Sequence, residues 1–310
     1  MASTSRNLLA LTAAGGLTAL LVSPAVALLR YPWGPMDGAA SEPPLYTNCT
    51  LCHNSGGPVN SKDGDLLISG LPGEYTPGAT YTLVIQLSDP AQQRWGFEIT
   101  ALDRNGAPAG GFMISDAVNT QLSVDPSTGN QYVKHTTTGT FAGAPGGATW
   151  SVDWTAPAAG TGTVYFYASG NAANWDNNQT GDFIYNAAAT IAEGGAAHPD
   201  MTLVLQPASA FVTAGDLVNL HATVRNHTQV RSSIWVVTQA TGPGGTSTFP
   251  PGGSLTPPVK LDLDPQGQAD VHFDLFLPAT VPPGTWRMTG AIGLPPATVV
   301  DRYEFDLTVY

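Results

Sequence analysis

Residues 79–89 read ATYTLVIQLSD, and residues 94–103 read RWGFEITALD. In both stretches the large apolar residues recur at every second position. This period is typical of a β-strand that buries one of its two faces. The two stretches therefore predict two strands of a β-fold, with apolar faces formed by Tyr81, Leu83, Ile85 and Leu87 and by Trp95, Phe97, Ile99 and Ala101.

The same alternation recurs in short runs along the rest of the chain. Turn-forming residues separate these runs, and the chain contains 35 glycines and 26 prolines. Many short strands at this spacing are typical of β-sandwiches, so we predict an all-β fold with two β-sandwich domains. The further runs are NQYVKHT, ATWSVDWTAP, TGTVYFYASG and FIYNAAATIA in the first domain, and MTLVLQP, DLVNLHATVRN, SIWVVTQA, QADVHFDLFLP, TWRMTGAIG and YEFDLTVY in the second.

The predicted segments are a signal peptide (1–27), an irregular leader (28–64), a first sandwich (65–192), a linker (193–200) and an immunoglobulin-like sandwich (201–310). The leader is rich in proline and glycine and has no periodic pattern, so it must pack on another part of the chain. The linker reads EGGAAHPD from residue 193. A second domain of this length fits an immunoglobulin-like fold.

The N-terminus has the features of a secretory signal peptide. A basic residue, Arg6, precedes an apolar run from Leu8 to Val22, and a small-x-small site follows at residues 25–27. The run is shorter than the roughly 20 residues of a spanning helix. An uncleaved membrane anchor is the alternative. We expect the mature chain to have no transmembrane span and to be extracytoplasmic: periplasmic, secreted or at the cell surface.

The chain is acidic and sparsely charged. Its formal charge is −12, with 11% charged residues, and loss of Arg6 with the signal peptide would make it −13. Such a surface repels phosphate backbones, which argues against a nucleic-acid partner.

The leader contains the only two cysteines of the chain, in the stretch TNCTLCHNSGG at residues 47–57. A c-type haem requires two thiols at this spacing and an imidazole directly after the second. Cys49, Cys52 and His53 supply these groups in that order. We therefore predict one covalent haem c, with His53 as the proximal ligand of the haem iron.

Three other interpretations of these cysteines stay open. A structural zinc site usually has four ligands, and no second cysteine pair exists. A redox-active CxxC pair usually opens a helix in a βαβ fold, which this sequence does not predict. A disulfide between Cys49 and Cys52 would close a very small loop and stabilise little.

Residues 40–192 resemble the reeler-type β-sandwich of bacterial secreted proteins, in which a short CxxCH segment precedes the sandwich. The most specific stretches are RWGFEITALD, YVKHT and WTAPAAGTGTV. The resemblance implies a haem-binding leader ahead of a reeler-like domain. Such proteins often end in a surface-sorting signal, whereas this chain ends in YEFDLTVY. Eukaryotic reeler domains share the sandwich without haem.

A second axial ligand has to come from elsewhere in the chain, which contains six histidines. His135 lies on the strand face of Val133 and falls in the YVKHT stretch, so we predict it as the distal ligand. A structural histidine that bonds a neighbouring loop is the alternative, and Met113 is a weaker candidate ligand. His221 and His272 are expected to face solvent, with His198 in the linker and His227 in a loop.

No catalytic motif stands out in the sequence. WDNNQTGD (175–182) resembles the start of a calcium loop. Counted from Asp176, however, the twelfth position of such a loop is Ala187 and not a glutamate, so a polar turn is favoured. We predict a single-electron carrier rather than an enzyme, with an unknown redox partner. The alternative is a non-redox surface or adhesion protein with a disulfide or vestigial CxxCH. The second sandwich would serve as spacer, docking module or self-association surface.

Overall fold

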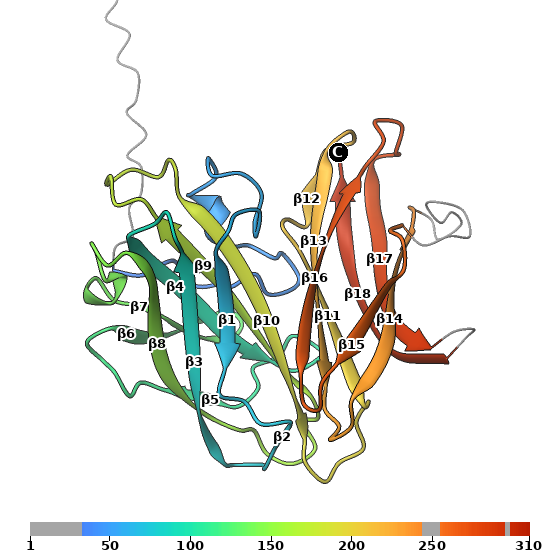
Figure 1. The fold of residues 1–310 in the computed structure, drawn as a ribbon, viewed down its shortest axis with the longest axis horizontal. Helices are drawn as coiled ribbons and strands as arrows, with labels where there is room; N and C mark the ends of the chain where they lie inside the picture. Colours follow the sequence, from blue (N-terminus) through green and yellow to red (C-terminus); the bar gives the residue numbers. More distant parts are fainter. Residues whose placement is uncertain (1–32, 244–254, 295–297) are drawn as a thin grey trace, which may run out of the picture. The chain divides into compact units, whose positions relative to one another are not determined.

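The computed structural model describes residues 33–243, 255–294 and 298–310 of the chain. The predicted signal peptide, residues 1–27, lies outside these residues. The described residues contain eighteen strands and two short 3-10 helices, η1 (Cys49–Leu51) and η2 (Thr138–Thr140). The strands form two pairs of sheets, as Figure 1 shows. The predicted fold class, all-β with two β-sandwiches, is confirmed.

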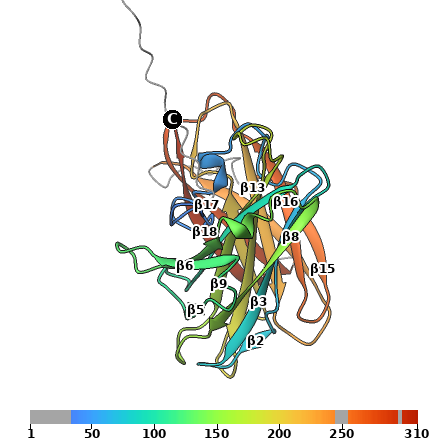
Figure 2. The same ribbon diagram turned by 90° about the vertical axis from the view of Figure 1, so that its left-hand side faces the viewer.

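The first sandwich consists of a four-stranded and a six-stranded sheet. All strands pair antiparallel except β2 and β10, which pair parallel. The hairpin of β6 and β7 forms one edge of the larger sheet (Figure 2). The four-stranded sheet has the order β1 (Asp65–Ser69), β3 (Thr80–Asp89), β8 (Gly146–Thr155), β5 (Gly111–Met113), and the six-stranded sheet has the order β2 (Glu74–Tyr75), β10 (Phe183–Glu193), β9 (Val164–Ala173), β4 (Arg94–Leu102), β7 (Gln131–His135), β6 (Thr120–Val124).

The two stretches that open the sequence analysis become β3 and β4, in opposite sheets. Leu83, Ile85 and Leu87 of β3 are fully buried in the same core cluster as Phe97 of β4. The ring of Phe97 packs 4.4 Å from that of Trp150, between centroids. The alternation therefore predicted the inward faces correctly, and the burial of these faces joins the sheets.

The second sandwich consists of a three-stranded and a five-stranded sheet around its own core. The alternation in β13 predicted correctly which side chains face this core: Val218, Leu220, Ala222 and Val224. The three-stranded sheet has the order β11 (Met201–Pro207), β13 (Leu217–Asn226), β16 (Gln268–Phe276), and the five-stranded sheet has the order β12 (Phe211–Val212), β18 (Thr298–Val309), β17 (Gly284–Leu294), β14 (Ser232–Thr241), β15 (Val259–Leu263).

The central strands of the six-stranded sheet are buried on both faces. In β4, β9 and β10 nearly every residue is buried, not every second one. Tyr165 and Tyr167 of β9 point away from the first core and cluster with Val204 of the second sandwich. The outer face of this sheet is thus a covered surface and not a solvated one.

The leader supplies much of this cover, and it contacts both sandwiches. On the first, the Ala39 N–H donates to Glu98 Oε2 at 2.7 Å. On the second, Tyr46 joins the core cluster and Asn48 Nδ2 donates to the Ala208 carbonyl at 2.9 Å. The leader therefore packs on other parts of the chain, as expected from sequence, and it does so on both sandwiches. The residues from 31 onward form one compact unit, and the finer division into domains stays a prediction.

Candidate functional site

The CxxCH segment forms one turn of 3-10 helix, η1. Asn48 caps it, because the Asn48 side-chain oxygen accepts the Thr50 N–H at 3.0 Å. The Cys52 N–H donates to the Cys49 carbonyl at 3.3 Å, and a 3-10 helix has three residues per turn. Residues three apart then lie on the same side of the turn. Cys49 and Cys52 thus begin and end a single turn.

Cys49 lies against the outer face of the six-stranded sheet. Its N–H donates to Ser169 Oγ of β9 at 3.2 Å. Burial raises the pKa of the Cys49 thiol to about 12, although the bond to Ser169 acts in the opposite direction. A thiol that stays protonated is a poor nucleophile, because the thiolate is the reactive form. This environment therefore does not suit a dithiol that exchanges disulfides.

His53 is held by a buried carboxylate. Its Nδ1 lies 2.6 Å from Asp182 Oδ2, and the Asp182 side chain is only 1% exposed. Asn171 Nδ2 is 3.3 Å from the same nitrogen, and Asp182 Oδ1 accepts the Asn174 N–H. With the Nδ1 proton donated to Asp182, Nε2 keeps its lone pair. Metal-ligating histidines are commonly oriented by such a carboxylate.

Asp182 ends the loop that sequence analysis compared with a calcium site. The loop is closed by its own turn hydrogen bonds, such as Asn178 N–H to Asp176 Oδ1 at 2.7 Å. In the part of the chain that the structure describes, no group of three or more His, Cys, Asp or Glu side chains could hold a metal ion. The loop's visible contribution is to place Asp182 beneath His53.

Gly56 permits the close approach of the leader to this loop. A Cβ atom at this position would lie 1.8 Å from the Asp182 carbonyl oxygen, which no rotamer change can relieve. We expect Gly56→Ala to displace the segment after His53 and to destabilise leader docking by about 1–3 kcal/mol, as overpacking does. Hydrogen exchange of residues 48–60 measures this. Gly111→Ala is a control for an added methyl group, since its φ is not positive and the nearest atom to a Cβ built there is Gln131 Oε1 at 4.0 Å. Equal protection in wild type and Gly56→Ala would contradict the account.

His135, the predicted distal ligand, lies at the end of β7 and is 8% exposed. The Phe97 N–H of β4 lies 3.0 Å from its Nδ1, and the imidazole occupies the space above Gly96. A Cβ at Gly96 would be 2.8 Å from His135 Cε1. Burial lowers the pKa of His135 to about 4, so the ring is neutral near pH 7, the form that binds a metal.

The fold brings His53 and His135 to neighbouring positions. Asn171, which contacts His53, is the register partner of Gly96, which underlies His135. The two imidazoles therefore contact paired residues of β9 and β4. The hydrogen bond to Phe97 is also what a purely structural histidine would make, so both interpretations of His135 agree with this geometry.

The structure separates Met113 from the cysteines. Met113 lies at the end of β5 in the four-stranded sheet, paired with Asp153, and is 50% exposed. Phe112, its neighbour, points into the core, so Met113 faces outward on the opposite side of the sandwich. The contacts of Met113 thus lie on the four-stranded sheet, whereas Cys49 contacts the six-stranded sheet, and the alternative of Met113 as an iron ligand stays a prediction.

Two other histidines differ from expectation. His221, expected to face solvent, is 9% exposed: its ring stacks on exposed His272 at 4.6 Å, and its Nδ1 lies 3.3 Å from Asn60 Nδ2 of the leader. The leader covers this face of the three-stranded sheet. The alternation of residues along β13 could not predict this cover. His227 follows β13, as expected, but it is buried and its Nδ1 bonds the Gly73 carbonyl.

Sequence analysis missed Asp182, Asn171, Gly96 and Ser169, the residues that position the cysteine and histidine side chains. No local signal marks them: Ser169, Asn171 and Asp182 lie 118 to 129 residues from the leader residues that they contact, and Gly96 lies on another strand than His135. Among the described residues, no helix is long and apolar enough to cross a bilayer.

Comparison with known proteins agrees with the scaffold. No family model matches the chain, and no curated protein matches it. The human F-spondin reeler domain is 25% identical. The match covers 44% of this chain and 91% of the reeler domain, with a TM-score of 0.31. A Reelin-N domain of F-spondin is 24% identical over 46% of this chain and 96% of its own, TM-score 0.32. The CARDB domain of PF1109 from Pyrococcus furiosus, in complex with di-metal ions, is 17% identical. The match covers 36% of this chain and 93% of that domain, with a TM-score of 0.29. These similarities concern β-sandwich domains and do not indicate a functional site in this chain.

Proposed function

We propose that this chain is an extracytoplasmic electron carrier with one haem c, attached through Cys49 and Cys52 and bound at the iron by His53. The observation that carries the proposal is the 2.6 Å contact of His53 Nδ1 with buried Asp182. This contact leaves the other ring nitrogen, Nε2, to bind an iron. His53 itself directly follows the two cysteines of one turn. A bound haem would supply an iron that cycles between two oxidation states.

Each residue would have a distinct task in this proposal. Cys49 and Cys52 would hold the haem covalently, and His53 would bind its iron. Asp182 holds Nδ1 of His53 and would make the imidazole more electron-rich. His135, neutral and next to Gly96, would be the second protein ligand. A haem held by two protein ligands would leave a substrate no open position, so electron transfer is favoured over catalysis.

A second candidate is a non-redox extracellular binding protein, with the cysteines disulfide-bonded or vestigial. The comparisons favour this candidate, since they offer a sandwich scaffold and nothing for the haem. An optical spectrum of protein made in a host that attaches haem c separates the two. The electron carrier has the Soret and α bands of a low-spin haem, whereas the binding protein has none.

Asp182→Asn tests the positioning of His53. The amide cannot accept a charge-assisted hydrogen bond, so we expect a raised reduction potential and a leader less stable by about 1–3 kcal/mol. Potentiometry measures the first effect, and hydrogen exchange of residues 48–60 measures the second without reference to haem. Asp176→Asn, in the same loop but exposed, is the matched control and should change neither. A potential that does not move in Asp182→Asn would contradict the role given to Asp182.

A further inference from the structure

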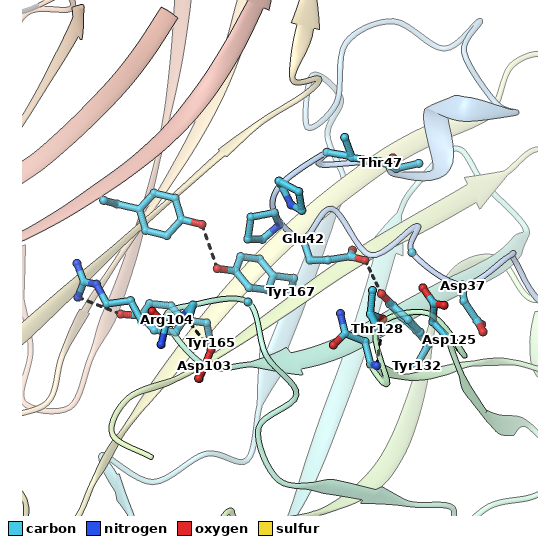
Figure 3. Close-up of a pocket in the computed structure, with 18 of the residues that line it drawn as sticks. Asp37, Glu42, Thr47, Asp103, Arg104, Asp125, Thr128, Tyr132, Tyr165 and Tyr167 are labelled. Carbon is cyan, nitrogen blue, oxygen red and sulfur yellow. Dashed lines mark hydrogen bonds between the residues drawn. The ribbon is translucent and has the colours of Figure 1, made fainter. Parts of the chain in front are cut away.

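A groove of about 930 Å³ lies beside the leader, and none of the residues assigned to the haem lines it. Leader residues form one part of its wall, and the loops after β4 and β6, tyrosines of β7 and β9 and residues 302–304 of β18 form the rest. Figure 3 shows Glu42 and Tyr132 on one side of this groove and Arg104 and Tyr165 on the other. The volume is that of a site for several side chains or a drug-sized molecule, and not for a single ion.

The leader side of the groove is apolar and exposed. Met36, Leu45 and Leu51 line it, and they are 42%, 55% and 58% exposed. Single exposed apolar residues are common on surfaces, but three that converge on one groove indicate a binding surface. Leu51 also lies between Cys49 and Cys52, so the groove borders the proposed haem attachment.

The groove is acidic. Its two arginines are Arg104 and Arg302, and Arg104 is paired with Asp301 at 3.1 Å. Two of its carboxylates are paired as well, Asp37 with Lys134 at 2.6 Å and Glu304 with Arg287 at 3.4 Å, so the excess negative charge lies at Asp103 and Asp125. No lysine lines it. A ligand of opposite charge is favoured here because complementary charge steers association and suppresses wrong partners. The carboxylates that line the groove are Asp37, Glu42, Asp103, Asp125 and Glu304.

Two polar side chains in the wall of the groove are buried. Glu42 is 7% exposed and Asn130 is 6% exposed. Tyr132 donates to Glu42 Oε1 at 2.8 Å, and burial raises the pKa of the Glu42 carboxyl. These two side chains therefore shape the wall, and the negative charge that a ligand meets comes from the other carboxylates.

We propose that this groove binds a segment of a partner protein that carries lysine or arginine beside an apolar residue. The ammonium or guanidinium groups face Asp103, Asp125 and Glu304, and the apolar residue packs on Met36, Leu45 and Leu51. That the partner is the redox partner rests on the function proposed above. The binding chemistry itself does not depend on the haem.

The test uses the mature chain and three probes in calorimetry at low ionic strength: a peptide of alternating Lys and Leu, one of alternating Glu and Leu, and spermine. We expect the Lys–Leu peptide to bind, more weakly as salt rises, and the Glu–Leu peptide not to bind. Leu45→Ser with Glu304→Gln should weaken the Lys–Leu peptide about tenfold, through lost apolar contact and one lost charge.

The matched control is Leu67→Ser with Asp264→Asn, which removes an exposed leucine of β1 and an exposed surface carboxylate outside the groove. It should leave binding unchanged. An equal loss in both double variants would overturn the proposal, and so would binding of the Glu–Leu peptide. Spermine that binds as tightly as the Lys–Leu peptide, with no effect of Leu45→Ser, would overturn it in favour of a small polycation. None of these readouts changes if the chain carries no haem.

Discussion

Replacing His135 by alanine is expected to convert a low-spin haem spectrum completely to a high-spin one and to let carbon monoxide bind the reduced iron. The reason is that the variant lacks the neutral, buried imidazole next to His53 that the second axial position requires. Optical spectra of the oxidised, reduced and carbon-monoxide-treated protein measure the change. Gly96→Ala should act in the same direction, because its Cβ would lie 2.8 Å from His135 Cε1.

Two controls separate ligation from a general loss of structure. His272→Ala removes an exposed histidine of the second sandwich, and Met113→Leu changes the half-exposed methionine of the opposite sheet. Both should keep the wild-type spectrum. A low-spin spectrum that survives in His135→Ala would leave His135 as a structural residue that bonds the Phe97 backbone.

Replacing Tyr46 by alanine is expected to have the largest effect on stability. Tyr46 is 1% exposed, belongs to the core cluster of the second sandwich, and packs edge-on to Phe305 at 5.5 Å between ring centroids. Removal of a buried aromatic ring costs about 3–5 kcal/mol. Because Tyr46 belongs to the leader, we expect the loss to appear as undocking of residues 33–64. Denaturant unfolding and hydrogen exchange measure it.

Tyr46→Phe is the conservative variant. It keeps the ring and removes only the hydroxyl contact with Tyr303 Oη at 3.3 Å, so a cost of about 0.5–1.5 kcal/mol is expected. A cost below about 1 kcal/mol for Tyr46→Ala would contradict the view that the leader is held by both sandwiches.

Strand faces could be predicted from the sequence wherever one face meets a core and the other meets water. Leu83 in β3 and Leu220 in β13 are examples, since alternation alone assigns them inward. In β9 the rule is insufficient, because Tyr165 and Tyr167 are buried outward as fully as Phe166 is buried inward. The cause is a second layer of protein, and strand periodicity carries no information about what lies beyond a sheet.

The chemistry of the candidate site divides in the same way. Cys49, Cys52 and His53 are local, and their spacing alone predicts a turn that presents both thiols on one side. Asp182 could not be predicted, because a loop 129 residues further along the chain brings it to His53. His135 was selected by its strand and its motif, and the structure places it near His53 through the pairing of Gly96 with Asn171.

The most direct test of the central claim is the intact mass of the mature protein, purified from a host that attaches haem c and denatured in acid. The account predicts the mass of the chain plus one haem, because thioether bonds at Cys49 and Cys52 survive unfolding. The mass of the chain alone, with Cys49 and Cys52 joined in a disulfide, would contradict it and would leave the extracellular binding protein as the function.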